Sequence, residues 1–344
     1  MFHRGHEHSG RLAHLVDELD LPDCDFFAWD ARGHGLSPGA RGDSPSFVTS
    51  VRDVQTFIEH IGSTHNFDEK DLAIVAQSVG AVVVATWAHD YAPKVRALIL
   101  ASPAFSVKLY VPFARAALRL IRAFRGNFFV DSYVKARFLT HDPARIQSYQ
   151  QDPLITKAIS VNMLLGLHEA ARRVVADAQA IQIPTQLLIS GADFVVERKP
   201  QVMFFERLGC LRKEKHLLPG FFHDTLGERD RERAVSQARR FILHNFETPT
   251  APPSLLDADR IGPMRAEAEA LAAPVAPNSI QECYWRAMRA GMRLGARLSH
   301  GMKLGFETGF DSGSTLDYVY RNEPAGLTLL GRKIDQLYLN SIGW

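Results

Sequence analysis

Short apolar segments recur along the first 246 residues, and each one ends in polar or glycine-rich sequence. They are CDFFAW (24–29), LAIVA (72–76), VRALILA (95–101), TQLLIS (185–190) and the weaker KEKHLL (213–218). Runs of this length between turn residues are typical of buried β-strands. We therefore predict a strand at each of these segments.

Segments with helical periodicity separate the apolar runs. They are RLAHLVDEL (11–19), SFVTSVRDVQTFIEHIG (46–62), VGAVVVATWAHDY (79–91) and RERAVSQARRFILHNF (231–246). Strands that alternate with helices at this spacing build βαβ units. The pattern predicts an α/β fold with a mostly parallel sheet and helices on both of its faces. In such sheets the binding and catalytic groups gather at the carboxyl ends of the strands.

The alternation stops between about residues 104 and 183, where the sequence is mostly helical and contains no convincing strand. An insertion of this size between two strands predicts a helical cap over one edge of the sheet. Residues 247–279 are rich in Pro and Ala, which is typical of a linker. Residues 280–344 predict a C-terminal helical extension, although glycines interrupt it. We therefore expect one domain over residues 1–246, followed by a linker and an extension.

The composition is that of an ordinary globular protein, with 46% hydrophobic and 23% charged residues. A net charge of +2 is too small to indicate nucleic-acid binding by itself. Cys24, Cys210 and Cys283 lie far apart, which argues against disulfides and thiolate metal sites and fits a reducing cytoplasm. Because no long apolar stretch and no apolar leader is visible, we expect neither a transmembrane helix nor a signal peptide.

Ser78 stands in VAQSVG (75–80), between a strand-like and a helical segment. A simple turn would use a serine there as a polar break. A serine hydrolase would use it as a nucleophile on a sharp strand-to-helix turn, which the small residues Ala76 and Gly80 would allow. The helix N-terminus has free N–H groups, and that of Val79 could stabilise an oxyanion. We interpret Ser78 as the candidate nucleophile.

Two further candidate groups follow predicted strands, in the order acid and then histidine. Asp193 lies just beyond TQLLIS, and His223 lies just beyond KEKHLL. Ser78, Asp193 and His223 should therefore meet at one edge of the sheet, as a nucleophile, its orienting acid and its base. Either of the last two could instead be an ordinary loop residue. Asp224 and Glu197 are the nearest alternatives for the acid.

Four motifs in this order resemble one branch of the α/β-hydrolase fold, the monoacylglycerol lipases and lysophospholipases. They are HRGHEHSGR (3–11), WDARGHGLSPG (29–39), AQSVG (76–80) and SGADFVV (190–196), and the resemblance spans residues 1 to about 246. The chain is more similar still to the hydrolase half of bacterial proteins that join an α/β-hydrolase to a class I SAM-dependent methyltransferase. Two late segments resemble the junction ahead of the second domain, GFDSGSTLDYVYRN (309–322) and GRKIDQLYLNSIGW (331–344). We find no Gly-rich SAM-binding motif after them, and assign no methyltransferase activity to this chain.

The resemblance implies a second oxyanion donor. In the family a loop of the form HGxGEHSGR supplies a backbone N–H two residues after its first histidine, which here is Gly5. Arg4 replaces the glycine that follows that histidine, and Ala76 stands where the family usually has glycine. In the ARGHG turn we expect Arg32 and His34 to organise the loop; the alternative is that they take part in the chemistry.

The family has a strand and a hairpin ahead of this loop, whereas here only Met1 and Phe2 precede it. That strand lies beside the nucleophile strand, so the resemblance predicts missing N-terminal strands and an unpaired gap in the sheet. A misassigned start codon or a fragment would explain such a gap.

The segment VPFARAALRLIRAFRG (111–126) is two-sided at helical spacing. Phe113, Ala117, Leu120, Ile121 and Phe124 fall on one face, and Arg115, Arg119 and Arg122 fall on the other. Residues 106–146 contain eight Lys/Arg and two Asp, a net charge of +6. This predicts either a cap helix packed on the sheet with its arginines in solvent, or a helix that contacts an anionic membrane surface transiently. An apolar cap face above Ser78 favours an acyl chain as substrate.

The sequence therefore predicts hydrolysis of a carboxylic ester with a lipid-like acyl group, without metal or organic cofactor. Thioester or amide cleavage by the same three residues is one alternative, since a fold does not choose among them. A non-catalytic hydrolase-fold module that tethers or regulates a methyltransferase through residues 280–344 is another. The expected partners are a small-molecule or lipid ester and a fused or separate methyltransferase domain, but not nucleic acid.

Overall fold

The computed structural model describes residues 1–108, 110–111, 113–132 and 134–248. All of these lie in the first of the two units into which the chain divides, Met1–Pro252. The predicted linker and C-terminal extension fall outside the described residues, apart from the first two residues of that linker. The predicted domain boundary at residue 246 stays a prediction.

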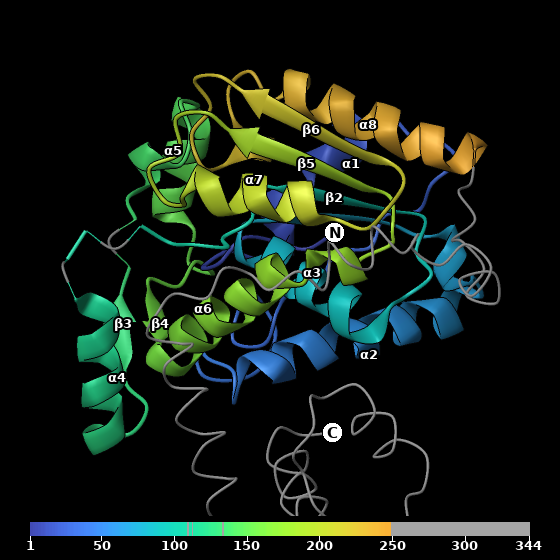
Figure 1. Cartoon of the computed structure of the whole chain (residues 1–344). Coiled ribbons are helices and arrows are strands. Elements are labelled where there is room, and N and C mark those ends of the chain that lie inside the picture. Colours follow the sequence, from blue (N-terminus) through green and yellow to red (C-terminus); the bar gives the residue numbers. More distant parts are fainter. Residues whose placement is uncertain (109, 112, 133, 249–344) are drawn as a thin grey trace, which may run out of the picture. The chain divides into compact units, whose positions relative to one another are not determined.

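Four parallel strands form the central sheet (Figure 1). They are β1 (Ala73–Gln77), β2 (Ala97–Ala101), β5 (Thr185–Ser190) and β6 (Lys213–Leu218), side by side in the order β1-β2-β5-β6. Every residue of β2 and β5 is buried, because helices cover both faces of the sheet. These strands match four of the five predicted segments, including the weak one at 213–218.

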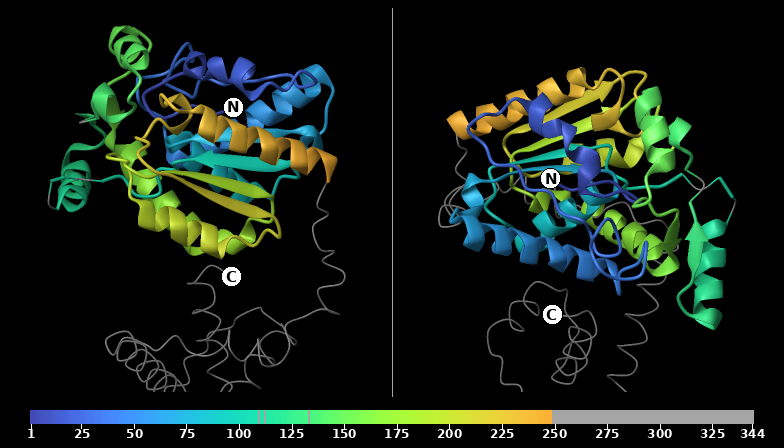
Figure 2. Two further views of the ribbon diagram at one scale, coloured as in Figure 1. Left: turned by 90° about the horizontal axis from the view of Figure 1, so that it is seen from above. Right: turned by 180° about the vertical axis from the view of Figure 1, so that it is seen from behind.

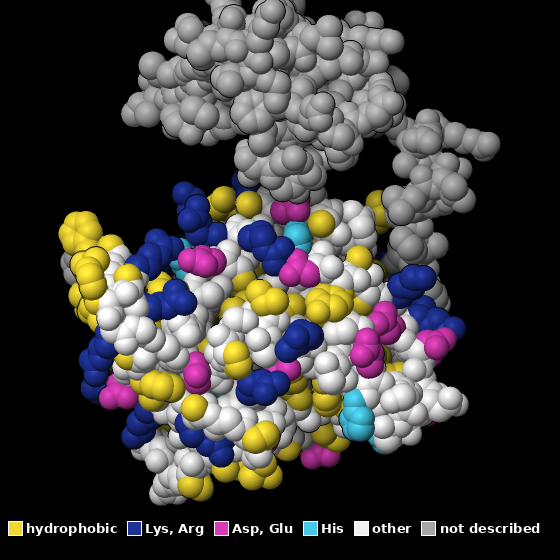
Figure 3. All heavy atoms as spheres, turned by 90° about the horizontal axis from the view of Figure 1, so that it is seen from below, with side chains coloured by type: hydrophobic (Ala, Val, Ile, Leu, Met, Phe, Trp, Pro, Cys, Tyr) yellow, Lys and Arg dark blue, Asp and Glu magenta, His cyan; other side chains and the backbone are white. Residues whose placement is uncertain are grey.

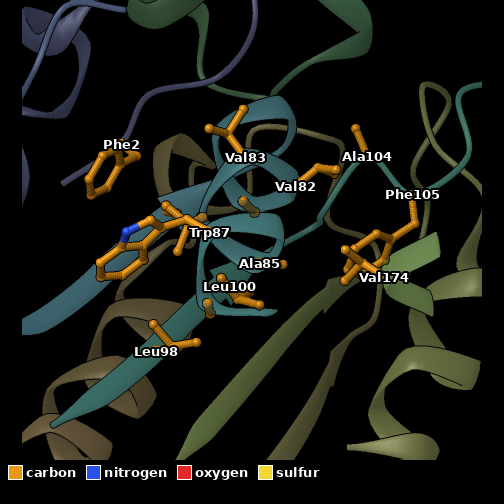
Figure 4. Close-up of a cluster of buried hydrophobic side chains, with 14 of the residues drawn as sticks. Phe2, Val82, Val83, Ala85, Trp87, Leu98, Leu100, Ala104, Phe105 and Val174 are labelled. Atoms are coloured by element: carbon orange, nitrogen blue, oxygen red, sulfur yellow. The ribbon is translucent and has the colours of Figure 1, made fainter. Parts of the chain in front are cut away.

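Helices cover the sheet from both sides, as the sequence predicts (Figures 1 and 2). On one side α1 (His14–Leu19) and α8 (Glu232–Glu247) pack on Val75, Ile99 and Leu188. The other face carries α2 (Phe47–His65), α3 (Val79–Tyr91), α6 (Val161–Ala176) and α7 (Arg198–Arg207). Leu98 and Leu100 of β2 point to this second face, where they join Trp87 of α3 (Figure 4). Alternate residues of β1, β2 and β5 thus contribute to two separate cores.

Short 3-10 helices complete the connections. They are η1 (Ser9–Leu12), η2 (Glu69–Asp71), η3 (Ala136–Phe138), η4 (Ala178–Ala180) and η5 (Thr225–Gly227).

The position beside β1, where the sequence predicts an unpaired gap, is occupied only in part. Phe2 occupies its carboxyl end: its N–H donates to the Val75 carbonyl at 2.9 Å, and its carbonyl accepts from the Gln77 N–H at 3.1 Å. The expected gap is therefore bridged at Phe2 alone, and the Phe2 ring is buried in the core (Figure 4). Farther along, the same position is a groove of about 490 Å³ between residues 23–27 and 71–75.

The strand predicted at residues 24–29 is wrong. No ladder forms there, and two backbone hydrogen bonds join the segment to the start of the chain: the Met1 amino group donates to the Phe27 carbonyl, and the Trp29 N–H donates to the Met1 carbonyl. Two hydrogen bonds are too few for a strand. Of the described residues, only Met1 and Phe2 lie beside the backbone of the segment, so most of that backbone has no partner with which to form a ladder.

The predicted cap region holds α4 (Ala114–Arg125), α5 (Pro143–Gln151) and two strands that the sequence analysis missed. These strands, β3 (Phe129–Asp131) and β4 (Ala158–Ser160), pair antiparallel. Each is three residues long, which is too short for a two-residue periodicity to show. The cap is therefore not purely helical.

The orientation of α4 is the reverse of the one expected for a cap helix packed by its apolar face. None of its residues is buried, and Phe124 and the preceding Phe113 are 86% and 87% exposed. Its arginines instead contact protein: Arg119 pairs with Glu169 of α6 at 3.6 Å, and Arg122 donates to Asn162. The arginines reach these polar partners because α6 turns acidic and amide side chains toward them.

Candidate active site

Ser78 occupies a sharp turn between the last residue of β1 and the first residue of α3. Its backbone angles, φ 56° and ψ −117°, are rarely adopted by a residue with a side chain, so the turn is strained. Its N–H donates to the Ala101 carbonyl at 2.9 Å, which fixes the turn on the sheet edge. Gly80 is required there, because a Cβ would lie 2.4 Å from the His3 carbonyl oxygen. Ala76, buried and paired with Phe2, fits the strand without distortion.

The structure brings Ser78, His223 and Asp193 together. His223 Nε2 lies 2.7 Å from the Ser78 hydroxyl oxygen, and its Nδ1 lies 2.8 Å from Asp193 Oδ2. Because a carboxylate only accepts, Nδ1 carries the proton and Nε2 presents a lone pair to the serine hydroxyl. That arrangement can take a proton from Ser78.

Asp193 is held in this position by the backbone that follows it. Its other oxygen, Oδ1, accepts from the N–H groups of Val195 at 2.7 Å and Val196 at 3.0 Å. Burial disfavours its charge, but attraction to His223 and these hydrogen bonds outweigh burial and lower its pKa. Asp193 is therefore ionised beside the imidazole.

The two alternative acids lie elsewhere. Glu197 precedes α7, and its backbone N–H bonds to the Ser106 carbonyl. Asp224 is adjacent to His223 in sequence, but its carboxylate accepts from Gln77 and Arg145 at 3.1 Å each. Among the described residues, the carboxylate recorded on the His223 ring is that of Asp193.

Gly5 and Val79, the two predicted oxyanion donors, lie against each other. A Cβ on Gly5 would be 3.0 Å from Val79 Cγ2, and both residues line the cavity that contains Ser78 and His223. The loop before Gly5 is fixed by the buried His3 ring: Nε2 accepts from the Ala31 N–H at 3.0 Å and Nδ1 donates to the Arg4 carbonyl. Burial lowers the pKa of His3 to about 3, so this tautomer is neutral.

Arg4 belongs to a buried ionic cluster beneath the site, which the sequence analysis did not predict. Its guanidinium bonds to Glu7 and lies 3.6 Å from Asp224 Oδ2. Gln77 donates to Asp224 and also, at 3.2 Å, to the His223 carbonyl. Burial opposes the Asp224 charge, but Arg4 and Arg145 outweigh it and hold its pKa well below its usual range.

The position of this cluster in the sequence is informative. Arg4 precedes Gly5, Gln77 precedes Ser78, and Asp224 follows His223. These three neighbours of candidate catalytic residues therefore carry polar side chains that join one network. Polar residues next to three candidate catalytic residues were the feature of the sequence from which this cluster could have been predicted.

The ARGHG turn lies beside this loop. Arg32 makes a two-pronged ion pair with Asp53 of α2, at 3.0 and 2.9 Å. The His34 ring bonds to the Arg32 carbonyl at 3.0 Å and also lines the cavity.

A cavity of about 420 Å³ opens above Ser78 and His223. Its walls are mainly apolar and come largely from the cap: Val111, Ala114, Ala117, Leu118, Val130, Val134, Leu139, Met163 and Leu167. The face of α4 that lines it shares only Ala117 with the apolar face predicted from the sequence. The site thus combines a buried hydroxyl, its base and an apolar chamber.

Two family models match the chain in succession. The family described as "Serine aminopeptidase, S33" matches residues 1–230, and the family described as "Putative methyltransferase" matches residues 238–344. Over all 344 residues the chain is 53% identical to "Uncharacterized protein YnbC" of Escherichia coli, and it spans 59% of that protein's length. These matches confirm the resemblance to proteins that join a hydrolase to a methyltransferase.

More distant relatives match the first part alone. "Monoglyceride lipase" of Rattus norvegicus is 26% identical over 252 residues, covering 72% of this chain and 79% of the lipase. The crystal structure of the Paleococcus ferrophilus monoacylglycerol lipase superposes with a TM-score of 0.64 at 23% identity, covering 71% of this chain and 93% of that one. The likeness confirms the predicted fold class.

Proposed function

The chain belongs to the serine aminopeptidase S33 family of α/β-hydrolases, and from this premise we propose that it is a serine hydrolase of carboxylic esters with lipid-like acyl groups. The observation that carries the proposal is the contact of 2.7 Å between the Ser78 hydroxyl and His223 at the base of an apolar cavity. The substrate class is that of the monoacylglycerol lipases and lysophospholipases that the sequence resembles.

In the proposed mechanism, the Ser78 oxygen attacks the ester carbonyl while His223 Nε2 takes its proton. Asp193 holds the imidazole in the required tautomer and stabilises its charged form. The N–H groups of Gly5 and Val79 hold the oxyanion of the tetrahedral intermediate. His223 then protonates the leaving alcohol, and water repeats the sequence on the acyl-enzyme to release the fatty acid.

The apolar walls of the cavity support an acyl chain as the bound group. A volume of about 420 Å³ is within the range of sites that enclose most of a small ligand, roughly 300–1,000 Å³. Thioesters and amides remain chemically accessible to the same residues, because the fold does not choose among acyl groups.

The exposed apolar face of α4 supports a transient contact with an anionic lipid surface. Phe113, Leu120, Ile121 and Phe124 are exposed there, in a region with a net charge of +6. α4 lies at the left of Figure 1, and at the left edge of Figure 3 hydrophobic side chains gather beside Lys and Arg side chains. A lipid surface would cover the apolar side chains and attract the basic ones. No helix among the described residues has both the length and the apolar character needed to cross a bilayer.

The match of residues 238–344 to the putative methyltransferase family supports a joint protein in which the hydrolase domain precedes a methyltransferase segment. The activity of that whole protein is a separate proposal, and the hydrolase site does not depend on it.

A substrate panel tests the proposed function. The full chain is incubated with a monoacylglycerol, a lysophospholipid, a p-nitrophenyl ester, an acyl thioester and an acyl amide, and fatty-acid release is measured. Turnover of the oxygen esters well above that of the amide supports the proposal. Turnover of the amide alone would contradict it.

A further inference from the structure

His6 stands next to the candidate oxyanion residue Gly5 in an unfavourable backbone conformation. Its φ is 69°, in the left-handed region where residues with side chains are uncommon. The loop motif that this segment resembles, HGxGEHSGR, has glycine at that position, and glycine adopts this φ without strain. This chain therefore places an imidazole where the backbone favours no side chain, and strained residues of this kind cluster at functional sites.

The His6 ring has unused hydrogen-bonding capacity at the cavity. Its Nδ1 is buried and has no hydrogen-bond partner among the described residues, and the residue lines the same cavity as Ser78. A buried polar atom without a partner is rare in folded proteins and is destabilising until something bonds to it. A ligand group in the cavity would supply that bond.

His34 lines the cavity with His6 and adds a second polar group. Its Nδ1 lies 3.0 Å from the Arg32 carbonyl, which can only accept, so Nδ1 donates and Nε2 keeps a lone pair. The free Nε2 of His34 can therefore accept a hydrogen bond from a ligand hydroxyl group in the cavity.

The two imidazoles are uncharged at neutral pH. Burial lowers the pKa of His6 to about 4, with further lowering by His34 and Arg4 and an opposing backbone bond from Thr156. Burial also lowers the pKa of His34. Two cations lie near the pair: Arg4 is already paired with Glu7 and Asp224, and Arg41, which acts on His34, donates to the Gly35 carbonyl. This end of the cavity therefore suits a neutral hydrogen-bonding group better than a phosphate.

We propose that His6 and His34 form a subsite for the hydroxyl groups of the leaving alcohol, so that esters of uncharged polyhydroxy alcohols are preferred over simple alkyl esters and over esters of phosphate-bearing alcohols. The proposal rests on the proposed function, because it assigns the alcohol side of the same site. The acyl chain occupies the apolar walls, and the alcohol lies toward Gly5 and His6. Ester cleavage then releases that alcohol next to the subsite.

The test compares two esters of one fatty acid, a monoacylglycerol and the corresponding methyl ester, with the full chain and its variants. His6→Gly removes the ring and His6→Asn keeps a short amide, and both residues accept a positive φ. Ala92→Gly is the matched control, because Ala92 also has a positive φ of 45° but is exposed at the end of α3. Melting temperatures show whether each variant folds.

We expect His6→Gly to lower kcat/KM for the monoacylglycerol about tenfold, the loss of roughly one hydrogen bond, and to change the methyl ester less than twofold. His6→Asn should recover part of the loss, and Ala92→Gly should change neither ester. The wild-type chain should also cleave a lysophosphatidic acid of the same acyl chain more slowly than the monoacylglycerol.

Equal losses on both esters would show that His6 acts only on the loop, and no loss on either would show that it binds nothing. Faster cleavage of the lysophosphatidic acid would contradict the preference for neutral alcohols. Each of these results overturns the subsite and leaves the esterase intact. A wild-type chain that cleaves none of the esters would refute the proposed function, and the subsite with it.

Discussion

His223 Nε2 lies 2.7 Å from the Ser78 hydroxyl oxygen although the two residues are 145 positions apart in the chain. The sheet produces this contact. Ser78 follows β1 and His223 follows β6, so both stand at the carboxyl edge of parallel strands, where Asp193 follows β5 between them. The predictions below follow from this arrangement.

His223→Ala and Asp193→Asn should each lower kcat for a p-nitrophenyl ester by about 10³- to 10⁴-fold, because the serine then lacks its base or the base lacks its orientation. Combining either with Ser78→Ala should add little, since the three residues act as one unit. Steady-state kinetics of the single and double variants measures this. Losses that multiply in the double variants would show independent roles.

Asp224→Asn should destabilise the fold strongly at neutral pH, by about 3–5 kcal/mol, because it leaves the buried Arg4 and the half-buried Arg145 without their shared counter-charge. The pKa of Asp224 is lowered in the folded state, so its stabilising contribution is present above the ordinary value of 3.8 and is lost as the pH falls through the lower folded value. Chemical denaturation of both proteins at several pH values measures this.

The difference in unfolding free energy between the wild type and Asp224→Asn should therefore shrink as the pH falls below about 4. Asp53→Asn is the control, because its ion pair with Arg32 is exposed and should contribute about 0–1 kcal/mol. A difference for Asp224→Asn that is small at pH 7, or constant with pH, would contradict the role of the cluster.

Gly80→Ala should destabilise the chain by about 1–3 kcal/mol and lower ester turnover, since the new methyl group would push the His3 carbonyl and move the loop that carries Gly5. Gly10→Ala serves as the control, because its methyl group would meet the His8 side chain and no backbone atom. Thermal melts and kinetics on a soluble ester report the two effects. Normal turnover by a destabilised Gly80→Ala variant would show that the position of the Gly5 loop does not affect catalysis.

Replacing Phe113 and Phe124 by Ser should weaken sedimentation with vesicles of anionic phospholipid and slow the cleavage of a long-chain monoacylglycerol embedded in them. Cleavage of a soluble short-chain ester should stay within twofold of the wild type, because both rings point away from the described protein. Val48→Ser, an exposed substitution on α2, is the control. Unchanged sedimentation of the double variant would contradict the proposed contact between α4 and lipid.

The sequence predicted the parts of the fold that rest on long periodic segments. The strands at β1, β2, β5 and β6 were found because buried parallel strands are continuous apolar runs, and Ser78, Asp193 and His223 were located from the ends of those strands. The strand expected at residues 24–29 did not form: its one buried residue, Trp29, packs on Phe2 and Phe57, and the segment has no neighbouring strand among the described residues with which to pair.

Other features depend on tertiary contacts that no periodicity records. The pairing of β3 with β4 joins residues about thirty positions apart through three-residue segments. The two-sided pattern of α4 predicts an apolar face and a basic face, but not which of them packs on the protein. That orientation depends on Glu169 and Asn162 of α6, which bind the arginines. The unpartnered His6 nitrogen appears only when the loop is folded against the cavity.

Covalent labelling tests the central claim, that Ser78 is an activated nucleophile, most directly. The full chain is treated with a fluorophosphonate, and the adduct is located by mass spectrometry of its peptides. We predict a single adduct on the peptide that contains Ser78, absent in Ser78→Ala and formed far more slowly in His223→Ala. An adduct at another serine of the folded chain, or no adduct while the melt is cooperative, would contradict the assignment.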